Sequence, residues 1–246
     1  MNILQFEDES EHSSSDEERS EDEQEESSDD QEDESSEPEL LTMKDFELIY
    51  PDRILFLGPS ESGKTTIIRH VINKYISSGK LAGGKKGVFW YGVNYSLEKW
   101  LPRGHGMKSI NKKQIDEIRT VMRTSFKGKS MIIVFDDVLL ESFHNDKWFS
   151  DFIGTCRHER IIVLIGIQYL NTISPVMRAN IKRLFVTWSN NTAIDLLHKQ
   201  STSGDKAKFQ SQLTNIKLGQ PVLLDFRPSA TIEVQRMSVG PLETLL

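Results

Sequence analysis

From about residue 40 onward, short apolar runs of strand length alternate with longer segments of helical periodicity. This alternation is typical of an α/β domain, in which helices flank a central, mostly parallel sheet. The predicted strands are 53–57, 87–93, 131–135, 160–168 and 184–188. The third and fourth are almost continuously apolar, which predicts central strands covered on both faces.

Helical periodicity is found in the intervening segments. We predict helices at residues 66–77 and 112–126, and further helical structure from residue 192 to about 213. Two short apolar runs at 221–226 and 231–235 predict a terminal strand pair. No internal repeat interrupts this pattern.

Residues 1–40 have a different composition. Residues 1–39 contain 19 Asp or Glu and one Arg, which leaves 18 acidic and 29 basic residues in the rest of the chain. The tail therefore carries −18 and the body +11. We predict a disordered acidic tail at 1–40 and one folded domain at 41–246. The tail either keeps the protein soluble or competes with nucleic acid for the basic body.

The remaining composition indicates an intracellular protein. Cys156 is the single cysteine, so an internal disulfide is excluded. The N-terminus lacks the apolar segment of a secretory signal, and no apolar run is long enough to span a membrane.

A phosphate-binding pattern, G-x-x-x-x-G-K-[ST], lies between the first predicted strand and the first predicted helix. The predicted ATP-binding residues are Gly58, Pro59, Ser60, Glu61, Ser62, Gly63, Lys64, Thr65 and Thr66. The glycines allow backbone amides to face the phosphates, and the helix N-terminus adds its dipole. Lys64 is expected to reach the β- and γ-phosphates, and the Thr65 hydroxyl to ligate Mg²⁺. The alternative interpretation is a glycine-rich turn that binds no ligand.

Polar residues end two of the central strands. Asp136 and Asp137 follow an apolar run, and burying unpaired carboxylates is costly. We therefore predict that Asp136 holds Mg²⁺ and that Asp137 polarises the attacking water, unless the pair is only a solvated strand end. Gln168 ends the next apolar strand, where additional-strand ATPases place a residue that senses the γ-phosphate. It is otherwise an ordinary strand-end amide.

These motifs together resemble the viral genome-packaging ATPases of the FtsK–HerA superfamily, in the poxvirus-type branch of large DNA viruses and virophages. The resemblance covers residues 53–190 and rests on four runs: GPSESGKTT at 58–66, IIVFDD at 132–137, RHERIIVLIGIQ at 157–168 and SPVMRANIKRLFV at 174–186. That family usually has Glu where Asp137 stands, although Asp also occurs. The expected fold is an additional-strand P-loop NTPase.

The resemblance implies a homo-oligomeric ring that hydrolyses ATP and threads double-stranded DNA into a capsid. It also implies capsid proteins as partners and viral assembly sites or the virion as the location. In such rings an arginine of one subunit reaches the nucleotide of its neighbour. Arg157 and Arg178 are the two candidates here, and either can instead be a surface or ion-paired arginine.

A surface for DNA is expected where basic residues gather between the second predicted strand and the next helix. The candidates are Lys99, Arg103, Lys108, Lys112 and Lys113. This segment is either a pore loop that contacts phosphates or a solvated connection.

Three other functions are alternatives to a packaging ATPase. A nucleoside or small-molecule kinase would need an Arg-rich lid, which the sequence does not show. A GTPase is disfavoured because no N-K-x-D motif follows the strand of Asp136. A non-hydrolysing, ATP-bound binding module is the non-enzymatic alternative, and it would show no DNA-stimulated turnover.

Overall fold

The computed structural model describes residues 40–126, 128–138, 146–200, 206–214, 216–226 and 234–240. The predicted acidic tail lies outside the described residues up to residue 39. The segment between the two terminal apolar runs, 227–230, lies outside them too, as do residues 231–233 of the last predicted strand.

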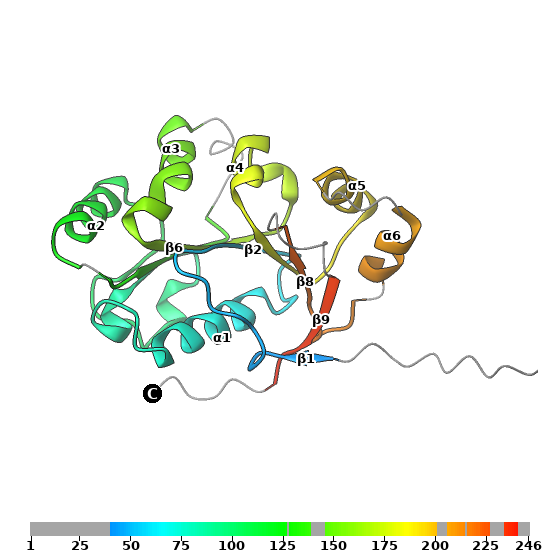
Figure 1. Ribbon diagram of the computed structural model, residues 1–246, viewed down its shortest axis with the longest axis horizontal. Coiled ribbons are helices and arrows are strands. Elements are labelled where there is room, and N and C mark those ends of the chain that lie inside the picture. Colours follow the sequence, from blue (N-terminus) through cyan, green and yellow to red (C-terminus); the bar gives the residue numbers. More distant parts are fainter. Residues whose placement is uncertain are drawn as a thin grey trace, which may run out of the picture. The chain divides into compact units, whose positions relative to one another are not determined.

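Within the described residues, nine strands form one sheet (Figure 1). The strands are β1 (Leu41–Thr42), β2 (Arg53–Leu57), β3 (Val88–Gly92), β4 (Gly106–Met107), β5 (Met131–Asp136), β6 (Ile161–Ile167), β7 (Arg183–Val186), β8 (Val222–Asp225) and β9 (Val234–Ser238). Their order is β1-β9-β8-β7-β2-β6-β5-β3-β4. The pairs from β7 to β4 are parallel, whereas β8 is antiparallel to both of its neighbours.

The position of β6 defines the type of fold. It pairs with β2, which leads to the phosphate loop, on one side and with β5, which ends in the two aspartates, on the other. This inserted strand is what distinguishes additional-strand P-loop NTPases, so the predicted fold class is confirmed. All positions of β2, β5, β6 and β7 are buried, as their continuous apolar runs predict.

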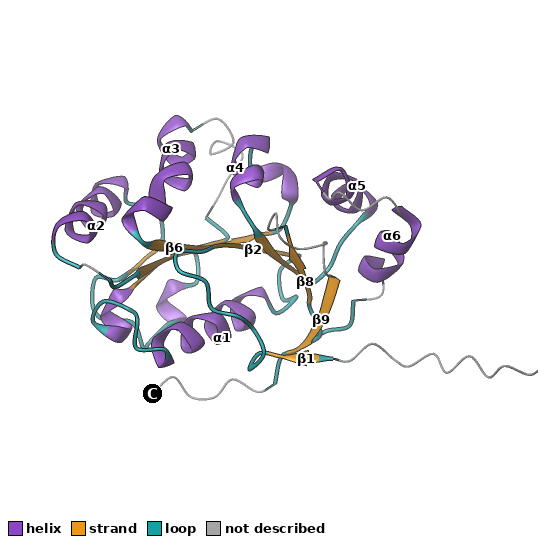
Figure 2. Cartoon of the chain, viewed as in Figure 1, coloured by secondary structure: helices purple, strands orange, loops and turns teal. Residues whose placement is uncertain are grey.

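Helices cover both faces of the sheet (Figure 2). They are α1 (Lys64–Ser77), α2 (Lys112–Thr124), α3 (Lys147–Thr155), α4 (Pro175–Asn180), α5 (Asn191–Gln200) and α6 (Lys206–Thr214), with short 3₁₀ helices η1 (Gly84–Gly87), η2 (Tyr95–Leu97), η4 (Cys156–Glu159) and η5 (Leu170–Thr172). The apolar side chains of α1 pack on one face of the sheet, together with Ile54 and Val134. The apolar sides of α2 to α6 pack on the other face. Among the described residues, no helix is long and apolar enough to cross a lipid bilayer.

Most predicted elements are found within a few residues of their expected bounds. The segment predicted to be helical from residue 192 to about 213 contains α5 and α6, and residues 201–205 between them lie outside the described residues. Two helices were missed. The cap of α3 is Asp146, which accepts from the N–H of Phe149, and α4 begins with Pro175 after the capping Ser174. Both are ordinary helix-start signals, so these two helices could have been predicted from the sequence.

Candidate nucleotide-binding site

The phosphate loop joins the end of β2 to the start of α1. The N–H of Gly58 donates to the carbonyl of Ile167 at 3.2 Å, which ties the loop to β6. Gly63 has a φ of 90°, a left-handed conformation that favours glycine, and α1 begins at the next residue. The first N–H groups of a helix have no partner within the helix, so this end of α1 suits an anion.

Close packing fixes the other end of the loop. A Cβ atom at Gly58 would lie 1.9 Å from the hydroxyl of Thr187 and 2.7 Å from that of Ser62. The Thr187 hydroxyl itself bonds Leu57 O at 3.0 Å and the Ser62 hydroxyl at 2.7 Å. Sequence reasoning did not single out Thr187, because its role comes from the pairing of β7 with β2.

Lys64 is buried inside the loop. Its ammonium donates to the carbonyls of Gly58 at 2.8 Å and Pro59 at 2.9 Å, and lies 3.7 Å from Asp137 Oδ2. The side chain is 4% exposed. Lys64 is thus held at the centre of the loop, where a bound phosphate chain would compete with the two carbonyls.

Thr65 and Asp136 meet as a metal site requires. The Thr65 hydroxyl donates to Asp136 Oδ2 at 3.0 Å. Asp136 Oδ1 is buried and accepts no hydrogen bond within the described part of the chain. A Cβ at Gly166 would lie 2.6 Å from that oxygen, so this glycine makes room for it. A glycine inside a strand is a sign of such close approach. These hard oxygen ligands suit Mg²⁺, so the residues fit the predicted metal.

Burial, followed by repulsion from Asp137, raises the pKa of Asp136 to about 6. A bound cation would oppose this shift, because an adjacent positive charge stabilises the ionised carboxylate. Asp137 has a φ of 53°, which is rare for a residue with a side chain. Its Oδ1 atom is also buried without a hydrogen bond among the described residues. The two aspartates therefore share an acidic, incompletely paired site beside Lys64.

Gln168 reaches the phosphate loop. Its amide nitrogen donates to the Ser60 hydroxyl at 3.2 Å. Glu61, beside it at the tip of the loop, is exposed and has a φ of 63°. The structure thus brings Lys64, Asp137 and Gln168 to one edge of the sheet.

The two candidate arginines lie in different settings. Arg178 on α4 turns back onto its own chain and donates to the carbonyls of Ile173 at 2.6 Å and Leu170 at 3.3 Å. Arg157 on η4 is exposed, and its Nε donates to the ring of His158 at 3.1 Å. Since η4 precedes β6, Arg157 lies at the edge of the sheet opposite the phosphate loop.

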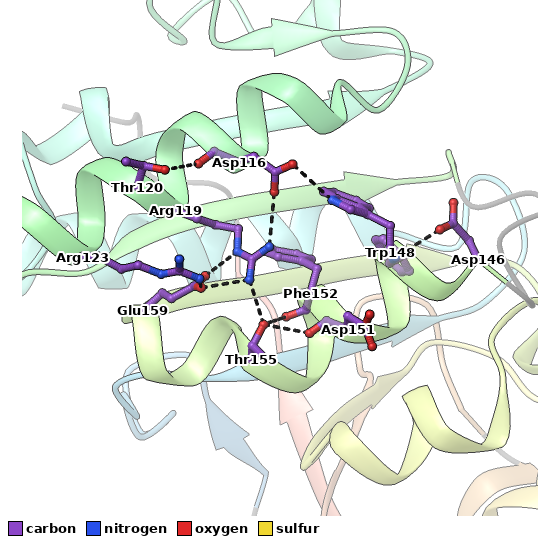
Figure 3. A network of polar contacts seen from close by, with 11 residues as sticks. Asp116, Arg119, Thr120, Arg123, Asp146, Trp148, Asp151, Phe152, Thr155 and Glu159 are labelled. Atoms are coloured by element: carbon purple, nitrogen blue, oxygen red, sulfur yellow. Dashed lines mark hydrogen bonds and ion pairs between the residues drawn. The ribbon is translucent and has the colours of Figure 1, made fainter.

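A polar network holds η4 in place (Figure 3). Both oxygens of the buried Glu159 accept from Arg119 of α2, at 2.7 and 2.9 Å, and Arg123 also bonds Glu159. Burial raises the pKa of Glu159, but the hydrogen bonds from these arginines outweigh it, so this pKa lies below its ordinary value. The network fixes the turn that presents Arg157.

The five basic residues predicted to bind DNA are all exposed, but they form two groups whose apolar neighbours pack on different faces of the sheet. Lys99 and Arg103 flank Trp100, which packs on the α1 face of the sheet. Lys108, Lys112 and Lys113 surround Ile110, which packs on the α2 face. Lys112 also pairs with Asp146 at 2.6 Å.

Glu98 connects the first of these segments to the nucleotide site, and sequence reasoning missed it. Its carboxylate is 2% exposed and accepts from Arg69 Nε at 3.0 and 3.1 Å and from Trp100 Nε1 at 2.8 Å. Arg69 lies one helical turn after Thr65. The loop that carries Lys99 is therefore attached to the helix that carries the phosphate loop.

Comparisons with known proteins bear on the fold. No protein-family model matches the chain, and no curated protein matches it. The genome-packaging NTPase B204 of Sulfolobus turreted icosahedral virus 2, solved with ATP-gammaS, superposes with a TM-score of 0.55 at 13% identity, covering 76% of this chain and 97% of B204. EssC (ATPases 2 and 3) from Geobacillus thermodenitrificans gives a TM-score of 0.53 at 12% identity, covering 79% of this chain and 41% of EssC.

At this level of identity the likeness concerns the fold. B204 from Sulfolobus turreted icosahedral virus, described as a DNA-packaging ATPase, gives a TM-score of 0.54 at 12% identity over 77% of this chain and 99% of that one. The chain therefore has the P-loop NTPase fold that B204 and the EssC ATPases also have, as the resemblance of its motifs predicted.

Proposed function

We propose that this chain is an Mg²⁺-dependent ATPase that translocates double-stranded DNA into a viral capsid as part of a homo-oligomeric ring. The observation that carries the ATPase is the buried Asp136 Oδ1, which has no hydrogen-bond donor in the described part of the chain and lies beside the Thr65 hydroxyl at a complete phosphate loop. A buried carboxylate oxygen without a donor is costly, and a cation bound with the nucleotide would offset that cost.

The residues divide the chemistry among them. Lys64 would exchange the carbonyls of Gly58 and Pro59 for the β- and γ-phosphates. Mg²⁺ on Thr65 and Asp136 would neutralise developing phosphate charge. Asp137 and Gln168 lie on the β5–β6 side of the loop, where they can orient and polarise a water.

Glu98 can transmit the effect of DNA contact to the nucleotide site. A phosphate held by Lys99 or Arg103 would pull on a loop that is attached to α1 through the Arg69–Glu98 pair. Because Glu98 is buried and bonded by two side chains, a movement of this loop must also move α1 or break the pair. Contact with phosphates rather than bases suits a motor that moves along any sequence.

The geometry favours Arg157 over Arg178 as the arginine that acts on a neighbouring subunit. Arg178 already donates to two carbonyls of its own chain. Arg157 is exposed at the edge opposite its own phosphate loop, so a nucleotide that it contacts must belong to another chain. The assembly sites and the virion are the proposed location.

The proposal is tested by the ATPase rate with and without long duplex DNA. Duplex DNA should accelerate hydrolysis, and long linear fragments should do so more than short ones. Lys64→Ala should abolish turnover with the fold intact. Replacing Lys99, Arg103 and Lys108 together by Ala should lower only the stimulation, whereas the same change at Lys80, Lys85 and Lys86 serves as the control. A rate that DNA of any length leaves unchanged in the assembled oligomer contradicts the motor.

Subunit mixing tests the ring. An arginine supplied by a neighbour contributes about 10³-fold or more to turnover. Arg157→Ala and Lys64→Ala subunits should each be nearly inactive alone, but together they should form some interfaces with an intact loop and an intact arginine. Rescue with Arg178→Ala in place of Arg157→Ala would reassign the role.

The acidic tail is proposed to shield the basic body, since −18 and +11 occur on one chain. Removing residues 1–39 should tighten DNA binding at low salt, and the gain should shrink as salt rises. Equal affinities at low salt would leave the tail as a solubilising segment.

A further inference from the structure

A cavity adjoins the phosphate loop on the side away from the aspartates. It measures about 180 Å³, and its walls include Gly63, Thr66, Ile67, Leu218, Pro221 and Val239. In the sheet, β7 lies on one side of β2, and β6 and β5 lie on the other. The cavity is on the β7 side, where Thr187 also lines it, whereas Asp136 ends β5.

The direction of a bound triphosphate follows from these positions. Lys64, Thr65 and Asp136 place the terminal phosphates on the β5 side of the loop. The nucleoside end must then leave the loop near Gly63 and Thr66, which line this cavity. An engineered cavity of about 150 Å³ can accept benzene, so this one has room for the ring of a base.

The walls offer few groups that could distinguish one base from another. The carbonyls of Lys217, Gly219 and Pro221 already accept from backbone N–H groups, at 3.0, 3.0 and 2.9 Å. The hydroxyls of Ser62 and Thr187 bond each other. Among the lining side chains, the Thr66 hydroxyl and the exposed Lys217 ammonium are the polar groups that remain.

Leu218 stands at the rim of this cavity and is 80% exposed. It follows Lys217 in the turn before β8, and the next residue, Gly219, has a φ of 79°. Such exposure costs free energy that a flat apolar ligand beneath the side chain would recover. A base and ribose are ligands of this shape.

We propose that this cavity holds the base and ribose of the nucleotide by apolar contact, so that the chain accepts purine and pyrimidine triphosphates alike. The inference rests on the proposed nucleotide hydrolysis at the phosphate loop and goes beyond it in naming the base site and its low selectivity. Sites that hydrogen-bond a substrate can discriminate by about 10⁴-fold or more, whereas apolar pockets discriminate by roughly 10- to 200-fold.

A neighbouring cavity of about 230 Å³ is the competing location. It is lined by Gln168, Trp188 and Thr192 and lies toward α5. Because Gln168 directly follows β6, the strand beside β5, this cavity lies nearer the expected terminal phosphate. It also lacks Gly63 and Thr66.

The test compares nucleotides with inorganic tripolyphosphate, which has no base. Dissociation constants of the full chain with Mg²⁺ should agree within about 10-fold among ATP, GTP and CTP, and tripolyphosphate should bind more weakly. Val239→Trp fills the cavity and should weaken all three nucleotides about 10-fold or more, with tripolyphosphate unchanged. Leu218→Ser should weaken them about 5-fold, at a position too exposed to disturb folding.

Thr192→Trp is the matched control, because it fills the neighbouring cavity and should leave nucleotide affinity unchanged. A stronger effect of Thr192→Trp than of Val239→Trp and Leu218→Ser would overturn the inference. So would a preference for ATP over GTP above about 10³-fold. Equal binding of ATP and tripolyphosphate by the unaltered chain overturns the base site alone, whereas binding of neither overturns the proposed function as well.

Discussion

The two edges of the sheet bury carboxylates in contrasting ways. At the edge where β2 and β6 begin, Asp52 and Glu159 have both oxygens bonded: Asp52 to Arg53 N, Tyr75 and Arg183, and Glu159 to Arg119 and Arg123. At the edge where β5 ends, Asp136 and Asp137 each keep one buried oxygen without a donor among the described residues.

This difference separates stability from function. Hydrogen bonds and arginine partners on both carboxylate oxygens offset the cost of burying these charges, so the first edge holds strands and helices together. The second edge retains an uncompensated cost, which a bound cation and nucleotide would remove. The pKa values move accordingly: that of Glu159 is lowered, because its hydrogen bonds outweigh burial, and that of Asp136 is raised to about 6 by burial and by Asp137.

The largest effect is expected from removing the arginine partner of a fully bonded carboxylate at the first edge. Arg183 is 1% exposed and bonds Asp52, which is 3% exposed. Arg183→Ala leaves Asp52 buried without its cation and should lower the free energy of unfolding by about 3–5 kcal/mol.

The control for this change is Arg123→Ala. That side chain is 57% exposed, and Glu159 keeps Arg119 without it, so the loss should stay below about 1 kcal/mol. Urea unfolding measures both variants. Similar losses would show that the buried Arg183–Asp52 pair is not what stabilises the fold at this edge.

The next effect depends on pH. The pKa of Asp136 rises from 3.8 to about 6 on folding, so the native state favours the protonated form. The stabilisation that comes from protonating Asp136 is complete below the pKa of this group in the unfolded chain. It is lost as the pH rises through 6. Between pH 4 and 7 the nucleotide-free chain should lose about 2–3 kcal/mol relative to Asp136→Asn.

Urea unfolding of both chains at several pH values, without Mg²⁺, measures this difference. Glu159 loses its own contribution as pH falls through 4.5 and below, but both chains contain it, so this loss cancels in the comparison. Parallel pH curves for the two chains would remove the evidence that Asp136 is strained by burial.

The contrast between the edges also explains what the sequence could reveal. The phosphate loop could be predicted because eight consecutive residues form it, and Asp136 because it ends a continuous apolar strand. Glu159 and Arg119 are 40 residues apart, and Glu98 and Arg69 are 29 apart, so no local pattern connects them. Only the packing of α2 and of the loop after β3 brings these pairs together.

The pairing at Thr187 is a similar case. Its contact with Ser62 spans 125 residues and depends on β7 lying beside β2, which periodicity alone does not predict. The family resemblance supplied the type of sheet, but it covered the last fifty residues poorly.

A smaller effect separates the two loop glycines. Gly58→Ala puts a Cβ 1.9 Å from Thr187 Oγ1, so β7 or the loop must shift, at a cost of about 2 kcal/mol and much of the nucleotide affinity. Gly63→Ala meets nothing within 4 Å and should cost about 1 kcal/mol from its φ of 90° alone. Thermal unfolding and ATP titration check the order. A larger loss at Gly63 would contradict the packing argument.

The smallest effect compares two residues with left-handed backbone, one at each edge. Asp137 follows β5 with a φ of 53°, and Arg160 precedes β6 with a φ of 59°. Glycine relieves this conformation, and Arg160→Gly should stabilise the exposed turn by about 0.5 kcal/mol. Asp137→Gly also removes a carboxylate with an unpaired buried oxygen, so it should stabilise the nucleotide-free chain by about 1 kcal/mol. It should abolish hydrolysis, whereas Arg160→Gly should not. If Asp137→Gly destabilises the chain while Arg160→Gly stabilises it, Asp137 supports the fold and the division between the two edges fails at that residue.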